Sequence, residues 1–152
     1  MKTHDNKKPN LVMSVLTNKC PRCRRGKLFK QDNPYKLKGL MEMNEQCPVC
    51  GQTTDMEPGF YYGTSYVSYA LAVAVSVATF IAWWVIIGFS LDDNRFFWWM
   101  GTNAIILIIL QPLLMRLSRS IWIYFFIRYS ERWKEGDIIK ADRVNKQLKN
   151  AW

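Results

Sequence analysis

The four cysteines of the chain form two Cys-Pro-x-Cys pairs, Cys20 with Cys23 and Cys47 with Cys50, and 23 residues separate the pairs. Two such pairs of thiolates are common ligands of a structural zinc ion, and this spacing is close to that of a zinc ribbon. Four sulfur ligands fill a tetrahedral site, so no coordination position stays open for catalysis. The pattern therefore predicts one structural zinc ion per chain, bound by all four cysteines.

The residues around the cysteines fit the tight turns of such a site. Pro21 and Pro48 lie inside the pairs, and Gly26 and Gly51 follow them, so we expect both glycines to adopt a positive φ. A zinc ion with four thiolates carries a charge of about −2, which nearby cations offset. Five basic residues crowd the first pair: Lys19, Arg22, Arg24, Arg25 and Lys27.

The segment 19–55 is predicted to be a small zinc-ribbon domain. It contains few large apolar side chains, and domains of this size usually need a metal or disulfides to fold. We expect short β-strands within 27–30 and 35–43, joined by a turn at 31–34. Residues 1–18, which precede this domain, are expected to be a disordered tail.

Two other kinds of chemistry use the same thiols. Each Cys-x-x-Cys pair could be a redox dithiol, although the β-α-β pattern of thioredoxin-like proteins surrounds neither pair. Met41 and Met43 could add soft sulfur ligands for copper or another exchangeable metal. Structural zinc is the leading interpretation, and a thiol-redox or metal-delivery protein is the alternative.

The sequence favours a protein that is not an enzyme. Its single histidine, His4, lies in the expected tail, and the chain contains no Gly-rich phosphate loop and no nucleophile elbow. We predict no catalytic residues and no small-molecule substrate.

Two long uncharged stretches, 66–89 and 96–115, predict a membrane hairpin. As helices they would be roughly 36 and 30 Å long, and the hydrocarbon core of a bilayer is about 30 Å thick. We expect transmembrane helices at 64–89 and 96–115, joined by an external loop at 90–95.

The basic residues predict the orientation of this hairpin. Of the 21 lysines and arginines, 20 lie before residue 64 or from Arg116 onward. The positive-inside rule then places both termini and the cysteines in the cytoplasm, where thiols stay reduced and available to a metal. The expected location is therefore a membrane that borders the cytoplasm. The net charge of +9 could also suit nucleic acid, but anionic phospholipid beside the bilayer is the more economical partner.

The helices offer two further candidate contact sites. Small side chains recur every fourth residue of the first span and predict a helix-packing face, against the second span or a partner: Ala70, Ala74, Ala78 and Ala82. After the second span, Arg116 and Arg119 are expected to contact lipid or a partner where the chain bends at the membrane surface.

Residues 116–152 are predicted to form an interfacial helix and a basic cytoplasmic tail. Four apolar positions share one helical face: Leu117, Ile121, Phe125 and Tyr129. Ile123 and Ile127 lie instead among the polar residues, so this amphipathic pattern is imperfect.

The stretches CPRCRRGKLF, CPVCG and QPLLMRLSRSIW, together with the hairpin, resemble a bacterial family of unknown function, DUF983. The resemblance covers residues 20–129. It implies a small cytoplasmic-membrane protein without assigned activity. Some similar proteins are encoded among genes for the assembly of haem–copper oxidases. We therefore expect a non-enzymatic membrane-anchored adaptor or assembly factor that acts on a membrane protein partner, such as a respiratory oxidase or an envelope complex.

Overall fold

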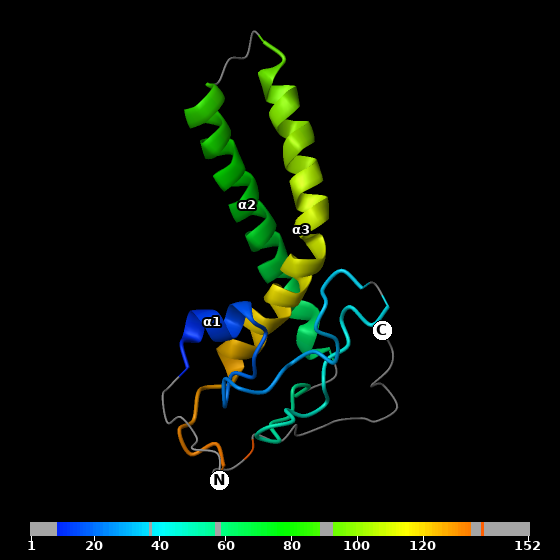
Figure 1. The fold of residues 1–152 in the computed structure, drawn as a ribbon, viewed down its shortest axis with the longest axis vertical. Helices are drawn as coiled ribbons and strands as arrows, with labels where there is room; N and C mark the ends of the chain where they lie inside the picture. Colours follow the sequence, from blue (N-terminus) through cyan, green and yellow to red (C-terminus); the bar gives the residue numbers. More distant parts are fainter. Residues whose placement is uncertain (1–8, 37, 57–58, 89–92, 135–137, 139–152) are drawn as a thin grey trace.

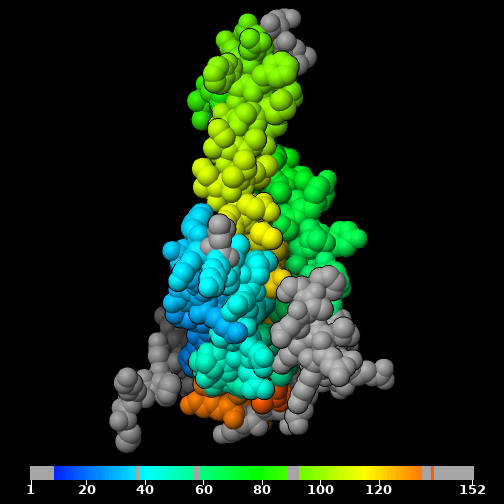
Figure 2. Space-filling model, turned by 90° about the vertical axis from the view of Figure 1, so that its right-hand side faces the viewer, coloured from blue at the N-terminus to red at the C-terminus, as the bar shows by residue number. Residues whose placement is uncertain are grey.

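The computed structural model describes residues 9–36, 38–56, 59–88, 93–134 and 138. These residues contain the α-helices α1 (Leu11–Leu16), α2 (Thr64–Ile87) and α3 (Arg95–Phe126), and the short 3-10 helix η1 (Phe60–Gly63). α2 and α3 lie side by side as a stalk, and the chain before α2 gathers around the lower part of α3 (Figure 1). Figure 2 shows this narrow stalk above a broader base.

The two long helices confirm the predicted pair of apolar segments. Both are long and apolar enough to cross a membrane, with a mean hydropathy of 2.4 within Phe60–Ile87 and 1.6 within Arg95–Phe126. Along α2 the helical residues are apolar or small and none is buried inside the protein, as expected for a helix that presents its surface to lipid.

Polar side chains join α2 to α3 in the upper part of the stalk. Asn103 of α3 donates to Ser76 Oγ at 3.2 Å, and its Oδ1 accepts from Thr79 Oγ1 at 2.9 Å. The rings of Phe80 and Trp99 meet edge to face beside them, with centroids 5.1 Å apart. Apolar burial does not drive helices together in lipid, so these contacts fix the alignment of the two helices.

α3 does not end where the uncharged stretch ends. The sequence predicted a bend at Arg116 and a separate interfacial helix, but the structure has one continuous helix of 32 residues. Its direction changes in the yellow part of the ribbon (Figure 1), and Pro112 lies inside the helix there. Proline removes one backbone hydrogen bond and crowds the preceding turn, which bends a helix without terminating it.

The lower part of α3 forms one wall of the base. Its buried side chains are Leu114, Arg116, Ser118, Ser120 and Ile123, and Ile127 follows at 2% exposure. Ile123 and Ile127 pack with Leu28, Phe29 and three of the cysteines in a single apolar core. This explains the imperfect amphipathic pattern, because the two isoleucines face the cysteine loops instead of lipid.

The short strands expected within 27–30 and 35–43 are not formed. In the part of the chain that the structure describes, pairing is limited to single antiparallel bridges: Lys19 with Lys27, Phe29 with Met43, and Gln46 with Thr53. Side chains donate to some of the backbone carbonyl oxygens that would accept from a neighbouring strand in a regular sheet. Asn44 Nδ2 donates to Lys27 O, and Thr54 Oγ1 donates to Asn44 O. The backbone polar groups are satisfied in this way without regular strands.

The ends of the chain also differ in part from the expectation. Residues 1–8 of the expected disordered tail lie outside the described residues, but α1 occupies 11–16 and contacts α3. Ser14 of α1 is buried, and Asn18 accepts a hydrogen bond from Ser120 Oγ at 2.6 Å. Residues 90–92 of the expected external loop and most of the basic tail lie outside the described residues.

Candidate metal centre

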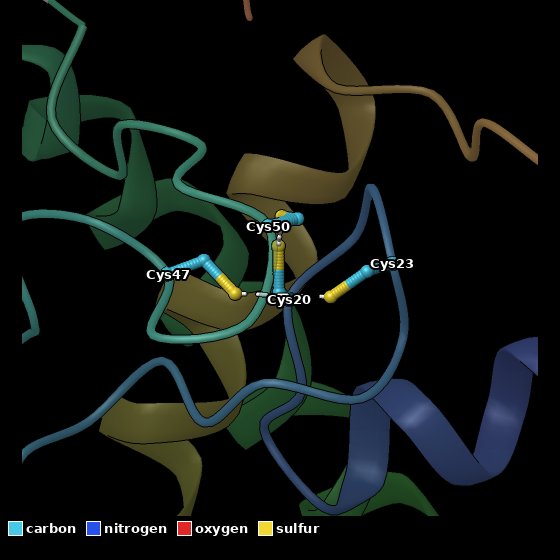
Figure 3. Close-up of side chains that lie close together, drawn as sticks. All are labelled: Cys20, Cys23, Cys47 and Cys50. Atoms are coloured by element: carbon cyan, nitrogen blue, oxygen red, sulfur yellow. Dashed lines mark hydrogen bonds between the residues drawn. The ribbon is translucent and has the colours of Figure 1, made fainter. Parts of the chain in front are cut away.

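Two loops bring the four cysteine sulfurs together beside α3. The side chains point toward a common centre (Figure 3), and all four sulfurs lie within 4.8 Å of one another. Cys20 Sγ is 3.7 Å from Cys50 Sγ, and Cys23 Sγ is 3.7 Å from Cys47 Sγ. Zinc–sulfur bonds of about 2.3 Å in a tetrahedron separate the sulfurs by about 3.8 Å. The residues therefore fit a tetrahedral metal ion bound by four thiolates, although the geometry does not identify the metal.

The two loops share one backbone hydrogen bond, from the residue after the second cysteine to the carbonyl of the first. Arg24 N donates to Cys20 O at 2.7 Å, and Gly51 N donates to Cys47 O at 2.9 Å. The residue after the second cysteine is left-handed in each loop, with φ of 54° at Arg24 and 70° at Gly51. Each loop is thus a tight turn that places both of its sulfurs on one side.

The positive φ predicted for Gly51 is confirmed, and the one predicted for Gly26 is wrong. The equivalent position in the first loop is Arg24, not Gly26. Gly26 is required for another reason, because a Cβ there would overlap Cys47 Sγ. Its amide also donates to Cys23 Sγ at 3.5 Å. This glycine allows the first loop to approach the sulfur of the second.

The centre is almost closed to solvent. Cys20 and Cys23 are each 1% exposed and Cys47 is 3% exposed, whereas Cys50 is partly exposed. None of the four forms a disulfide. Met43 and Met56 pack against the same apolar core, as gap-filling methionines do. Such a site retains a metal by burial and leaves little access to a reacting thiol.

Mutual hydrogen bonding distributes the protons of the four thiols unevenly. Bonds with its neighbours, with Cys23 first, raise the pKa of Cys20, whereas hydrogen bonding from Cys20 lowers the pKa of Cys23 and brings the pKa of Cys47 to about 6. The four thiols therefore titrate as one coupled group, and those that ionise favour a cation at the centre.

Aromatic rings hold basic residues beside the first loop. Arg24 lies 4.6 Å from the Tyr129 ring centroid and donates to Pro9 O at 2.9 Å, and Arg25 lies 5.9 Å from the Trp133 ring. Arg22 is buried at 3% exposure. These cations offset the negative charge of a metal with four thiolates.

The two arginines predicted to touch lipid or a partner both contact this chain, and their contact with lipid or a partner stays a prediction. Arg116 is 2% exposed and donates from Nε to Leu40 O and from Nη1 to Asp32 O, at 3.0 and 3.2 Å. Arg119 donates to Met41 O at 3.0 Å and lies 5.1 Å from the Tyr61 ring. Both arginines join α3 to the loop between the cysteine pairs by donating to its carbonyl oxygens.

The alanine stripe is exposed. All four of its residues lie on the surface of α2, whereas Ser76, Thr79 and Phe80 face α3. The stripe is therefore not part of the contact between the two helices. Its role in contacting a partner stays a prediction, with Ala70, Ala74, Ala78 and Ala82 as the residues concerned.

Several residues of the junction between stalk and base were not singled out from the sequence. Tyr124 Oη donates to Lys19 O at 3.1 Å next to the first cysteine, and Trp122 Nε1 donates to Phe60 O at 2.7 Å. A Cβ on Gly63 would overlap the Trp122 ring. The spacing of Arg116, Ser120, Ile123 and Ile127 along one helical face was the available signal for this buried side of α3.

Together these features define a class of protein in which two long apolar helices carry a cluster of four cysteines that could hold a metal ion, built against the end of the second helix. Comparison with known families is consistent with this class. The model of a protein family of unknown function, DUF983, matches residues 37–126, which is 90 of the 152 residues. The chain belongs to this family, as the resemblance implied. The match includes the second cysteine pair, the hairpin and α3. No curated protein and no solved structure matches the chain.

Proposed function

We propose that this protein is a membrane-anchored adaptor or assembly factor whose four cysteines hold a structural zinc ion. The observation that carries the proposal is the set of four sulfurs that lie within 4.8 Å of one another, three of them on nearly inaccessible cysteines. Zinc is the metal that such a closed thiolate site commonly binds. Its role would be to fold the base, because a segment this short otherwise buries too little apolar surface.

A role in assembly is supported by where the base lies. Its core includes Ile123 of α3, so the folded domain is held directly at the end of the hairpin. The loops around the cysteines present surface beside the expected bilayer, where another membrane protein would meet them. The positive-inside distribution of basic residues supports a cytoplasmic position for this domain, in the inner membrane of a bacterium.

The buried centre gives little support to the redox alternative. Two sulfur contacts of 3.7 Å connect one loop to the other, which suits a metal shared between the loops, and three of the thiols are shielded from an exchange partner. Metal delivery would need the ion to leave, and only Cys50 is partly exposed. Both alternatives use the same four residues, so an experiment must separate them.

Metal content and partner recovery test the two parts of the proposal. Full-length protein purified in mild detergent should contain about one zinc per chain, with thiols that react only after chelation. Zinc well below this level, or a reversible disulfide in its place, would refute the structural role.

For the adaptor role, in-membrane crosslinking should give a stoichiometric complex with one membrane protein. A C20S/C47S variant that still inserts in the membrane should lose that complex. If the wild-type chain crosslinks to no partner, or if the variant keeps the partner fully, the adaptor role is wrong.

A further inference from the structure

A cavity beside the first cysteine loop has the composition of an anion-binding site. It encloses about 240 Å³ between the start of the first loop, the segment around Asp32, and α3. The polar residues that line it include Asn18, Lys19, Lys27, Asp32 and Arg116, and Phe29 forms part of its wall. Nothing in the metal centre uses this cavity, which therefore calls for a separate explanation.

Arg116 supplies the strongest indication of a ligand. Its guanidinium lies 4.9 Å from the Phe29 ring centroid, and carbonyl oxygens accept from Nε and Nη1. Nη2 is buried and has no hydrogen-bond partner. A buried guanidinium N–H without an acceptor is unfavourable, and an anion in the adjoining cavity would supply that acceptor.

The charges around the cavity favour an anion over a neutral molecule. Three cationic side chains and one carboxylate line it, which leaves a net charge of +2. Lys27 Nζ contacts Asp32 Oδ2 at 2.6 Å, and this hydrogen bond lowers the pKa of Asp32, so that carboxylate is ionised and occupied by Lys27. Neither Lys19 nor Arg116 belongs to an ion pair among the described residues, so Asp32 offsets only part of the positive charge of the lining.

The position of the cavity points to the phosphate of a lipid or a phosphate ion. Arg116 directly follows the uncharged stretch 96–115, which is about as long as the hydrocarbon core is thick. Arg116 is therefore expected at the depth of the headgroup phosphates. A guanidinium and an ammonium together suit the several oxygens and the charge of a phosphate group.

We propose that this cavity binds a phosphate group, with Arg116 Nη2 and Lys19 Nζ as its donors. This site is separate from the metal centre and does not depend on the adaptor role. The sequence predicted only a general attraction between basic residues and anionic lipid. The proposed site is more specific, because it assigns the contact to one cavity and two donors.

Direct binding measurements on the full-length, zinc-loaded protein in detergent test the site. Short-chain phosphatidylglycerol and inorganic phosphate are titrated separately by calorimetry, at fixed ionic strength. Arg116 also holds two backbone carbonyls, so the informative variant is Lys19→Gln, with zinc content as the check on folding. Losing one charge-assisted hydrogen bond should weaken phosphate-group binding roughly tenfold.

Two matched variants distinguish the cavity from general electrostatic attraction. Asp32→Asn removes the one negative charge of the lining. It should therefore raise the affinity for the phosphate group several-fold, the opposite of the effect of Lys19→Gln. Lys36→Gln removes an exposed charge outside the lining and should leave the affinity unchanged.

Binding of phosphatidylglycerol that phosphate does not displace identifies a lipid site, whereas binding of phosphate alone identifies a free anion site, and either supports the proposal. No binding of either compound, or equal weakening by the two lysine variants, would overturn it.

Discussion

In the first cysteine loop, Arg24 has the positive φ that was expected at Gly26, and Gly26 instead leaves room for Cys47 Sγ. The left-handed residue after each cysteine pair allows the loop to close, and in the first loop this residue is Arg24. Left-handed backbone is unfavourable for a residue with a Cβ, by roughly 1–2 kcal/mol. The hydrogen bond of Arg24 to Pro9 O and its contact with Tyr129 help to offset that cost.

Replacing Gly26 by alanine should damage the metal centre. The added Cβ would overlap Cys47 Sγ, which is itself a ligand and cannot move without losing its position. We expect Gly26→Ala to lower the free energy of unfolding by about 1–3 kcal/mol and to reduce the zinc content per chain. Metal analysis and denaturant unfolding of the purified protein measure both effects.

Gly101→Ala is the matched control for this change. No heavy atom lies within 4 Å of a Cβ at Gly101, which is exposed in α3. The control should keep the wild-type zinc content. A normal zinc content in both variants would show that Gly26 does not limit the approach of the two loops.

At this scale the sequence identified the cysteines but not their surroundings. Spacing alone was sufficient for Cys20, Cys23, Cys47 and Cys50, because two Cys-x-x-Cys pairs at this separation have few other uses. The role of Gly26 depends on where a second loop lies, and the local sequence contains no record of that. The same holds for Arg116, whose burial follows from the loop that folds over it.

α3 combines two environments within one element. Its first part pairs with α2 through Asn103, and its last part lies in the core of the base through Ile123. The change of direction near Pro112 allows both contacts without a break in the helix. The uncharged stretch ends at residue 115, but the helix continues beyond it.

Asn103→Leu should loosen the hairpin and leave the metal centre intact. The change removes both hydrogen bonds to α2, and interhelical hydrogen bonds in membranes contribute about 0.6 kcal/mol each on average. We therefore expect a loss of about 1 kcal/mol in stability, measured by reversible unfolding in mixed micelles.

Thr102→Val provides the comparison for the hairpin. Thr102 is exposed and donates only within its own helix, to Trp98 O at 2.8 Å. Stability should stay within about 0.5 kcal/mol of wild type in this variant. An equal loss in the two variants would argue against a specific role of the Asn103 contacts.

Secondary structure could be predicted from the sequence where a long uncharged stretch specifies a helix. The two long apolar helices follow from length and lack of charge, and the structure confirms them. The strands expected within 27–30 and 35–43 are replaced, among the described residues, by single bridges such as that of Phe29 with Met43, and side chains of Asn44 and Thr54 bond to nearby carbonyls. The continuity of α3 was missed because the chain was expected to bend at Arg116, with that residue in contact with lipid or a partner, whereas the fold supplies its polar partners.

In the whole molecule the metal centre and the end of α3 share one core. Ile123 and Ile127 pack with Cys20, Cys23 and Cys47, and Tyr124 bonds to the backbone beside Cys20. Removing the metal should therefore release the end of α3 as well as the cysteine loops.

Hydrogen exchange before and after chelation measures this coupling. Amides around Ile123 and Ile127 should exchange at least roughly tenfold faster in the metal-free protein. Amides in the middle of α2 serve as the internal reference and should not change. Unaltered protection at Ile127 after the metal is lost would show that the base folds independently of the ion.

The continuous helix from the stalk into the base also determines how far this protein can reach. A domain on a flexible linker explores a volume that grows with the length of the linker and can capture partners at a distance. Here Ile123 lies only eight residues beyond Met115, or about 12 Å along a helix, and no linker separates the two. The cysteine loops are thus kept at a constant height above the apolar stretch, and a partner must come to that level to bind them.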